Sequence, residues 1–450
     1  MKTNEELNRA GDVLIEEISL VSAAGFSLDI RSFLVELNIY ESVFSPVMSG
    51  NMVVSDSLNL FKELKLIGEE YLIIKLRTPT FDDVDIIQKT FRVYSITDRK
   101  LVDQNTQGYI LNFVSYETMK DLVNPLFKSF SGVISDVVAK IYENELSVSR
   151  TLVIDGNTVK DPDTRTPLNI LNETANSVKF VSPGWSPIKC INWLCSKAIP
   201  KSGKACNFLF WETNKSFYFG NIEKIFELAK SNPHLSIGEY RHAPAGVLDV
   251  DDLNGKFFII DSLSIPKTHD TLSSLKNGFL HNRILTLDLM NKSYKYTDYD
   301  HTKKFKEYVH SMGSDAEVIP YYTESSLRNS RNNFKFYPVQ SGLYTDFKDN
   351  VNEKMVDIFG NRLSNMLELR NFKLEINIPG RTDVEVGSLI NVDLTDTSPV
   401  DDSDFTNNKR DELYSGRHLI TKIHHKINPA RHSMIMEIVK DSLTNYVGVY

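Results

Sequence analysis

The end of this 450-residue chain repeats the order of segments found near its beginning. In each copy, an apolar segment with several β-branched residues is followed by a short alternating segment and then by a longer segment that ends with Lys-Asp. Such segments predict β-strands, so we interpret them as two diverged copies of one β module. A module repeated far apart in one chain favours symmetry, and therefore assembly, over catalysis. The segments are 69–79, 91–97 and 109–122 in the first copy, and 386–394, 418–423 and 433–443 in the second.

Length and composition indicate a soluble protein of several domains. A chain of this length is too long for one core and predicts roughly two to four domains. Hydrophobic residues make up 41% of the chain and charged residues 24%, as in globular proteins. The net charge of −8 argues against a protein that coats nucleic acid, but not against one past which nucleic acid moves. No apolar run is long enough to span a bilayer and no signal core follows the N-terminus, which favours a cytosolic protein.

The three cysteines are predicted to be buried, reduced side chains. Cys190 and Cys195 lie on a segment with helical periodicity, 186–198, and would point about 140° apart around that helix. They would therefore not share a metal ion. Together with Cys206 they fit a reducing compartment, where cysteine behaves as a small hydrophobic residue.

Four histidines gather in the last predicted hairpin. His418 and His424 are an even number of residues apart and could share one face of a strand. We favour a partly exposed basic hairpin, which includes Lys422 and Lys426, over a metal site. The four residues are His418, His424, His425 and His432.

Acidic motifs offer alternatives that we judge to be surface features. The pairs within 82–85 and 249–252 resemble metal-binding Asp-x-Asp motifs, but both lie in charge-rich turns. The loop 395–412 fails as an EF-hand because Phe405 occupies a ligand position and Thr406 replaces the glycine. We favour a surface loop there over one that orders against a partner. Phosphate-binding glycine loops and common hydrolase motifs are absent from the sequence, so we nominate no catalytic, cofactor-binding or metal-binding residue.

One apolar cluster has two interpretations. Trp185, Ile188, Ile191 and Trp193 could form a docking patch on the surface. The spacing fits the core face of a helix better, and we favour that interpretation.

The order of predicted elements divides the chain into three parts. Helical patterns occupy 132–142, 166–177 and 186–198, and a further helix is expected over 344–369 with a break at Gly360. The strand–turn–strand–helix pattern of 207–226 resembles that of 33–61, so the second copy is predicted to be split. The predicted domains are 1–118 for the first β-barrel, 119–205 with 250–335 for a mixed α/β insert, and 206–249 with 336–450 for the second barrel.

Four further segments resemble the baseplate central hub proteins of contractile-tailed phages, which are related to the hub region of type VI secretion spike proteins. They follow the order of that family from about residue 12 to 445, and they are structural motifs without a catalytic signature. The segments are 39–61, 288–299, 376–387 and 414–425.

This resemblance implies a mainly β fold with α/β insertions, comprising two similar β-barrel tube domains plus a mixed α/β insert domain. It implies a homotrimer whose six barrels form a pseudo-sixfold ring in the virion, assembled in the host cytoplasm, between the tail tube protein and a central spike. Because the chain ends at Tyr450, soon after the last predicted strand, we expect a separate spike polypeptide. Other baseplate proteins are expected partners, and DNA would pass through the lumen without specific binding. Neither a cofactor nor stable membrane insertion is expected.

Two rival functions remain open from the sequence. One is a cell-wall hydrolase of the tail tip, since the many carboxylates could include an acid/base pair. The other is a receptor-binding surface protein. If the hub interpretation is correct, a charge at Leu374, on an apolar strand face, should disrupt folding or assembly.

Overall fold

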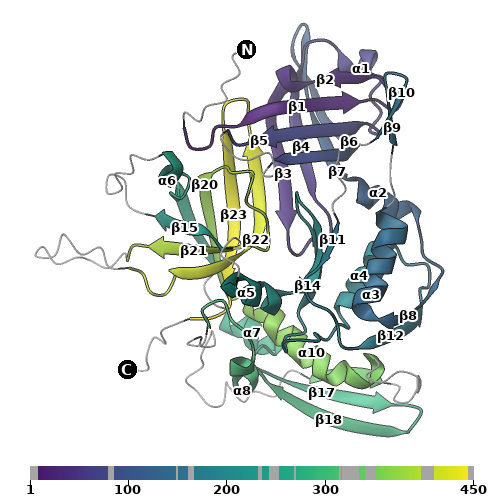
Figure 1. The fold of residues 1–450 in the computed structure, drawn as a ribbon, viewed down its shortest axis with the longest axis vertical. Coiled ribbons are helices and arrows are strands. Elements are labelled where there is room, and N and C mark those ends of the chain that lie inside the picture. The colour runs from purple at the N-terminus through teal and green to yellow at the C-terminus, as the bar shows by residue number, and fades with distance from the viewer. Residues whose placement is uncertain are drawn as a thin grey trace, which may run out of the picture.

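A computed structural model shows a mainly β protein whose largest feature is a 13-stranded sheet (Figure 1). Smaller sheets and helices pack around this main sheet. The predicted mainly β fold is thus confirmed. The structure describes residues 9–79, 86–147, 151–160, 167–231, 236–242, 253–267, 270–313, 316, 334–339, 351–396 and 410–443.

Six strands between residues 14 and 115, which we call the first unit, form one part of the main sheet. They lie in the order β1-β5-β6-β7-β4-β3, every ladder is antiparallel, and the short β2 (Ser27–Asp29) lies beyond β1. A short helix, α1 (Leu60–Glu63), follows β4. The strands are β1 (Leu14–Val21), β3 (Leu34–Ser42), β4 (Ser49–Asp56), β5 (Tyr71–Arg77), β6 (Ile87–Asp103) and β7 (Thr106–Ser115).

Six strands further along the chain, the second unit, repeat this arrangement. Their neighbours follow the order β15-β21-β22-β23-β20-β16. Every ladder is antiparallel except that between β15 and β21, which is parallel where β1 and β5 are antiparallel. The strands are β15 (Ser236–His242), β16 (Ser262–Lys267), β20 (Phe372–Pro379), β21 (Leu389–Leu394), β22 (Gly416–Ile427) and β23 (His432–Lys440).

A β-bulge marks the same point in both units. The β6–β7 ladder shifts register between Val93 and Ser95, and the β22–β23 ladder shifts between Ile420 and Lys422. Superimposing the bulges aligns 91–97 with 418–424, which is the correspondence that the sequence repeat predicts. The repeat is therefore carried by equivalent strands with equivalent irregularities.

The Lys-Asp endings of the two copies are not equivalent, contrary to the sequence comparison. Lys120 lies on α2 (Tyr116–Val123), the helix that follows β7. Lys440 instead ends β23, where the register makes it the counterpart of Ser115. The shared letters arise at different places in the fold.

The two units join through β3 and β22, which lie side by side in Figure 1. These strands are antiparallel, from Lys422 opposite Ser42 to Ile427 opposite Leu37. A second link ties the ends of β5 and β20, where Thr78 and Thr382 each donate a backbone N–H to the other's hydroxyl oxygen, at 3.1 Å. The units consequently share one continuous sheet.

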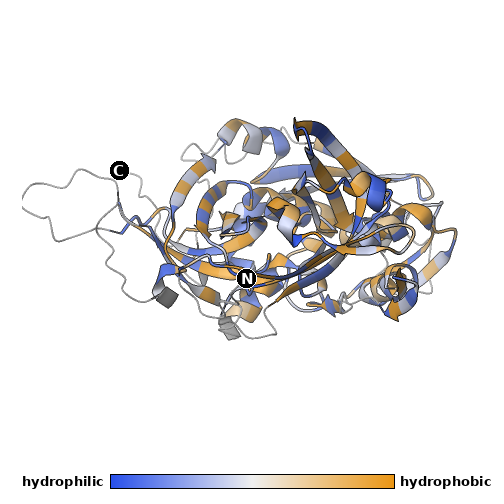
Figure 2. Cartoon of the chain, turned by 90° about the horizontal axis from the view of Figure 1, so that it is seen from above, coloured by the Kyte–Doolittle hydropathy of each residue, from blue (hydrophilic) through white to orange (hydrophobic). Residues whose placement is uncertain are grey.

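Each unit has its own hydrophobic core. Along the strands, apolar and polar residues alternate, as the hydropathy colouring of Figure 2 shows. Leu374 of β20 is fully buried in the second core, as predicted for its strand face. Ile427, at the end of β22, reaches across the junction and is buried in the core of the first unit.

A third core lies in the α/β part that follows the first unit. Helices α3 (Ile134–Ile141) and α4 (Pro187–Cys195) form where the sequence predicts them, and they pack on this core. A one-turn π-helical segment, Tyr142–Leu146, extends α3. Two paired strands, β8 (Ser129–Val133) and β12 (Ser177–Val181), lie in the same part.

The helix predicted over 166–177 is wrong. This segment contains β11 (Leu168–Ile170), which pairs in parallel with β14 (Phe217–Asn221). Leu168 packs on the third core and Leu171 on the core of the second unit. The segment therefore contacts two different cores, and its apolar spacing does not reflect one helical face.

The hairpin predicted over 207–226 forms, with a helix after it. It comprises β13 (Phe208–Glu212), β14 and α5 (Ile222–Ser231). Its strands belong to a separate three-stranded sheet with β11, not to the main sheet. Phe210 faces the third core while Trp211 packs into the second unit, so the hairpin bridges the two cores.

A further three-stranded sheet packs against the long helix α10 (Val351–Glu368). The predicted break at Gly360 is wrong, because α10 continues through it. A Cβ at Gly360 would lie 2.7 Å from Cγ of Tyr299, so this glycine allows close packing of the helix on β18. The strands of this sheet are β17 (His281–Asp288), β18 (Ser293–Asp300) and β19 (Phe334–Val339).

The remaining elements are short. Within the described ranges, no ladder closes the main sheet on itself, and no helix is long and apolar enough to cross a membrane. The short elements are β9 (Thr151–Ile154), β10 (Asn157–Lys160), α6 (Leu253–Lys256), α7 (Thr271–Asn277) and α8 (His301–Lys304).

Candidate functional site

The cysteines are buried and reduced, as the sequence predicts. Cys190 and Cys195 belong to the third core, and Cys206 packs against α10. Burial raises the pKa of the Cys195 thiol to about 12, so it stays protonated at neutral pH. These residues have the properties of small hydrophobic side chains.

His418 and His424 do not share a strand face, contrary to the sequence prediction. The bulge between Ile420 and Lys422 adds one residue and reverses the alternation of β22 between them. His418 is buried, and its Nδ1 donates to the carbonyl oxygen of Gly416 at 2.9 Å. His424 lies on the outer face, with Nε2 2.6 Å from Oδ1 of Asn38 on the neighbouring β3.

The other two histidines lie inside the junction between the units. His425 Nδ1 is 3.0 Å from His432 Nε2, and His425 Nε2 is 3.7 Å from a carboxylate oxygen of Glu41. All three side chains are buried. Burial, together with the neighbouring His425, lowers the pKa of His432 well below its usual value. This cluster joins β3, β22 and β23. The hairpin is partly exposed and basic, as we expected, because Lys422 and Lys426 are exposed, but three of its four histidines are buried.

A buried ion pair fixes the bridging hairpin to the first unit. Lys89 Nζ of β6 lies 2.7 Å from Oε1 of Glu212 on β13, and both side chains are at most 3% exposed. The other oxygen of Glu212 accepts hydrogen bonds from the Met48 backbone N–H and the Ser115 hydroxyl. The carboxylate is thus fully satisfied, as a buried charge requires.

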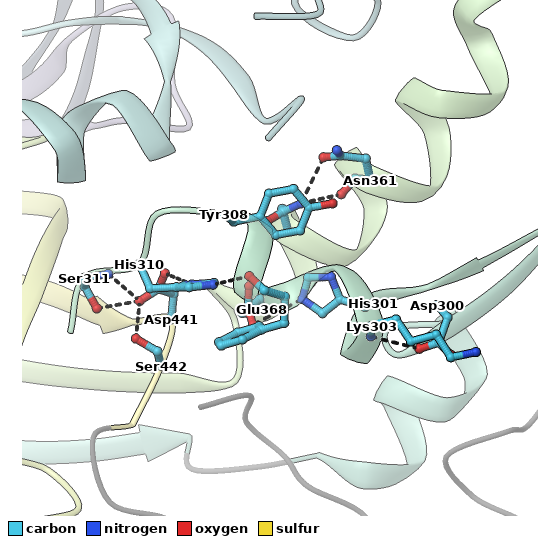
Figure 3. A network of polar contacts seen from close by, with 12 residues as sticks. Asp300, His301, Lys303, Tyr308, His310, Ser311, Asn361, Glu368, Asp441 and Ser442 are labelled. Carbon is cyan, nitrogen blue, oxygen red and sulfur yellow. Dashed lines mark hydrogen bonds and ion pairs between the residues drawn. The ribbon is translucent and has the colours of Figure 1, made fainter. Parts of the chain in front are cut away.

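The residue types of a catalytic triad do meet, in the polar network of Figure 3. His310 Nδ1 donates to Asp441 at 2.9 Å, and the Ser311 hydroxyl donates to the same carboxylate at 2.5 Å. His310 Nε2 lies 2.9 Å from the carbonyl oxygen of Phe305 and must also donate. An imidazole that donates from both nitrogens is charged. Burial opposes this charge, but the hydrogen bond and charge of Asp441 outweigh it and raise the pKa of His310 to about 9.

This geometry does not activate a nucleophile. A serine nucleophile needs a hydrogen bond to a free imidazole nitrogen, whereas Ser311 is bonded to Asp441 and Nε2 of His310 is occupied by a carbonyl. All three side chains are buried as well, so a substrate has no access. The network instead joins Asp441, the residue after β23, to the segment 305–311, which begins with a 3-10 helix at Phe305–Glu307.

A second part of the network lies beside α10. His301 Nε2 is 3.3 Å from Glu368, and its Nδ1 is 3.3 Å from the hydroxyl of Tyr299, which contacts that of Tyr308 at 2.8 Å. His301 is fully buried and Glu368 nearly so. Figure 3 shows His301, Glu368 and Tyr308 converging beside the helix. The network therefore holds α10 and the β17–β18 region against the second unit.

The apolar cluster on α4 is part of a core, as we favoured. Ile188 and Ile191 are buried, and Trp185 and Trp193 pack beside them with ring centres 5.7 Å apart. The acidic motifs at 82–85 and 249–252 and most of the loop 395–412 lie outside the described residues. Among the residues that are described, no group of three or more metal-ligating side chains could hold an ion.

Two surface features were not found from the sequence. A hollow of about 390 Å³ opens between the end of α4, β19 and α10, with Lys197, Tyr337 and Arg362 in its lining. Aromatic side chains cover the outer face of the β18-β17-β19 sheet. They are Tyr294, Tyr296, Phe334 and Phe336, each 49% exposed or more. The alternation of aromatic residues within β18 and within β19 could have indicated this exposed aromatic face from the sequence. Only the order of the strands in the sheet shows that the four aromatic residues lie together.

Solved structures resemble this chain over nearly its whole length. A tail protein from Neisseria meningitidis matches with a TM-score of 0.50 at 11% identity, covering 94% of this chain and 96% of that protein. A 43 kDa prophage tail protein from Shewanella oneidensis matches with a TM-score of 0.51 at 9% identity, covering 94% and 98%. The chain has the fold of phage tail proteins. No family model and no curated protein matches the sequence.

This likeness confirms, at the level of fold, the expected resemblance to phage tail proteins. Further matches include an Escherichia coli component of the type VI secretion system, with a TM-score of 0.42 at 8% identity, covering 97% of this chain and 79% of that protein. That likeness is too weak to support an argument. What the chain does must therefore be argued from its own residues.

Proposed function

We propose that this protein is the structural hub of a contractile phage tail baseplate, a homotrimer in which each chain contributes two equivalent units to a pseudo-sixfold ring. The observation that carries this proposal is the repeat within the main sheet, where two sets of strands share one order and one bulge position. Three such chains present six equivalent units, which lets a threefold assembly contact a sixfold one.

The two units would be the two β-barrel tube domains that each chain contributes to the ring. We propose the domains 1–118, 119–205 with 250–335, and 206–249 with 336–450. Strand pairing favours one adjustment, because β16 occupies in the second unit the place of β3 in the first. Under this adjustment, residues 262–267 belong to the second tube domain.

The proposed partners are the tail tube protein on one side and a separate central spike protein on the other, with further baseplate proteins around the ring. The site of action would be the virion tail, after assembly in the host cytoplasm. A net charge of −8 on every chain would disfavour binding of DNA to the lumen, so DNA could pass. No chemistry is required of the chain in this role.

The alternative, a tail-tip hydrolase, finds less support. The buried His310, Ser311 and Asp441 have the residue types of a triad but the hydrogen bonds of a structural ion pair. We therefore propose a non-enzymatic protein. Purified protein should leave the turbidity of a suspension of bacterial cell walls unchanged, and clearing of that suspension would contradict this.

The mass of the purified protein tests the hub proposal. Light scattering over a concentration series should show a species near three times 51.3 kDa, and electron microscopy of that species should show a ring with six similar lobes. The same measurement is repeated after the proposed central spike protein is added, because a trimer that requires the spike would form only in this mixture. A monomer at every concentration, with and without the spike protein, would overturn the proposal.

A further inference from the structure

Among the described strands, two edges have no pairing partner at positions where their counterparts are paired. In its second half, β22 pairs with β23 on one side and β3 on the other. The equivalent half of β6, from Ser95 onwards, pairs with β7 alone among the described strands. Likewise β3 is paired on both sides, whereas its counterpart β16 pairs with β20 alone among the described strands. Each unpaired edge thus corresponds to one side of the junction within the chain.

The ladders give the counterparts residue by residue. On β6, Thr97, Lys100 and Leu101 occupy the positions of His424, Lys426 and Ile427 on β22. On β16, the positions of Leu37, Asn38 and Tyr40 are occupied by Leu263, Ser264 and Lys267.

Both unpaired edges differ from the internal junction by one extra residue at the same place. Two residues separate Thr97 from Lys100, where one separates His424 from Lys426. Two residues also separate Ser264 from Lys267, where one separates Asn38 from Tyr40. The two insertions would lie opposite each other, so an antiparallel pairing of β6 with β16 keeps a continuous register. Two unrelated edges would have no reason to match in this way.

Exposure of apolar side chains agrees with this correspondence. Ile427 is fully buried because it reaches into the core of the adjoining unit. Its counterpart Leu101 is 82% exposed, and the next residue, Val102, is 71% exposed. On the other edge Ile265 is 42% exposed, and Leu263 is only partly buried against the second core. Leu101 therefore lacks, among the described residues of its own chain, the kind of core that buries Ile427.

We propose that β6 of one copy pairs antiparallel with β16 of a second copy, reproducing between chains the junction that β22 and β3 make within one chain. In this ladder Thr97 lies opposite Lys267, Lys100 opposite Ser264, and Leu101 opposite Leu263. Leu101 enters the core of the second unit of the neighbouring chain. The contact joins two different surfaces, so it continues from copy to copy and ends only when a ring closes. This inference rests on the proposed hub function and names the surfaces that build the ring.

The edges carry features that discourage other pairings. Pro266 lacks a backbone N–H and lies in the inserted part of β16, and Asp98, opposite it in the proposed ladder, has a φ of +54°. Irregular positions and prolines are common devices against non-specific strand pairing. Here they fall opposite each other, so they would restrict the edge to a partner with the matching irregularity.

A charge at Leu101 tests the proposal without disturbing the isolated fold. Leu101→Lys places the charge on a side chain that is exposed in the single chain, so the thermal unfolding midpoint of the monomer should not change. The trimer mass seen by light scattering should be lost, leaving 51.3 kDa. Leu289→Lys, at a residue 66% exposed on another surface, is the matched control and should keep the trimer. A fully trimeric Leu101→Lys protein would overturn the proposal.

Cross-linking tests the register. Leu101→Cys and Leu263→Cys in one chain should give disulfide-linked species up to the trimer on a denaturing gel after mild oxidation, because opposed strand positions suit disulfide geometry. Leu101→Cys with Val181→Cys, a pair whose second site is also exposed, should not. A trimer by light scattering without the Leu101–Leu263 cross-link would refute the strand pairing and leave the hub function standing. Monomers in every condition, with the spike protein included, would refute both.

Discussion

At the scale of single residues, titratable side chains in this protein support the fold, and two histidines do so with opposite charge states. His310 is held charged by Asp441, whereas His418 is held neutral. Burial, together with the nearby charge of Lys440, lowers the pKa of His418 to about 3. The two groups therefore limit stability on opposite sides of neutral pH.

Replacing Asp441 should remove the basis for the charge on His310. Asp441→Asn should lower the free energy of unfolding by about 3 kcal/mol, as expected when one partner of a buried ion pair is lost. Because the folded pKa of His310, about 9, exceeds the unfolded value, its contribution is complete below about pH 6.5 and is lost as the pH rises to 9. Urea unfolding from pH 6.5 to 9.5 should show this loss in the wild type and a flatter profile in the variant.

A suitable control is the exposed ion pair of Asp300 and Lys303, at 3.2 Å, in which Lys303 is 81% exposed. Lys303→Ala should cost less than about 1 kcal/mol, since solvent screens such pairs. Equal losses from Asp441→Asn and Lys303→Ala would contradict the role given to the buried pair.

His418 should limit stability in acid. Its folded pKa, about 3, lies below the unfolded value, so the unfolded chain takes up the proton first and stability falls as the pH drops from about 6.5 towards 3. We expect His418→Gln to have a smaller loss of unfolding free energy between pH 7 and pH 4 than the wild type. The measurement is urea unfolding of both proteins at several pH values, from which the slope of unfolding free energy against pH is compared between wild type and variant. Parallel slopes would show that the pKa of His418 does not differ between the folded and the unfolded chain, and would contradict this prediction.

At the scale of elements, alternation and helical periodicity predicted most strands and helices, and the errors have identifiable causes. The segment 166–177 has helical spacing because the partly buried Leu168 and Leu171 pack against two different cores. Gly360 was predicted to break a helix, but it lies within the continuous helix α10 and allows this helix to pack closely against Tyr299. In both cases a contact with a segment distant in the sequence determines the local structure. Such a contact leaves no local pattern in the sequence.

The candidate networks were less predictable than the elements. The four histidines were recognised as a cluster, yet the bulge in β22 separates His418 from His424, and a bulge depends on the partner strand. His310 and Asp441 are far apart in the chain, and nothing in either segment indicates that they pair. Sequence periodicity gives faces of elements, whereas buried polar pairs arise from the packing of those faces.

Substitutions in β20 test which face of this strand is buried in the core of the second unit. Leu374→Lys should prevent folding or cost several kcal/mol, because it places a charge in the fully buried core of the second unit. Glu375→Lys, at the exposed neighbouring position on the opposite face, should change stability by less than about 0.5 kcal/mol. Soluble expression and thermal unfolding of both variants decide the matter. A stable, assembled Leu374→Lys protein would contradict the assignment of this face.

At the scale of the whole molecule, the repeat in the sequence was the most useful signal, and the sheet shows what it builds. Two sets of six strands share their order, apart from the direction of β15. The sequence comparison placed the second set only in part, since it assigned the hairpin at 207–226 where the structure uses β16 and β20. These strands have diverged so far that register, and not residue identity, reveals their relation.

The junction between β3 and β22 has a thermodynamic consequence for assembly. In a ring of the proposed kind, every second joint already exists inside a folded chain, closed by the β3–β22 ladder and by Thr78 with Thr382. Ring formation then restricts the translation and rotation of three separate chains. A ring of six separate subunits would restrict the translation and rotation of six. A covalent link turns half of the encounters into intramolecular events at high effective concentration. Fusion of the two units would thus favour complete rings over partial ones at low protein concentration.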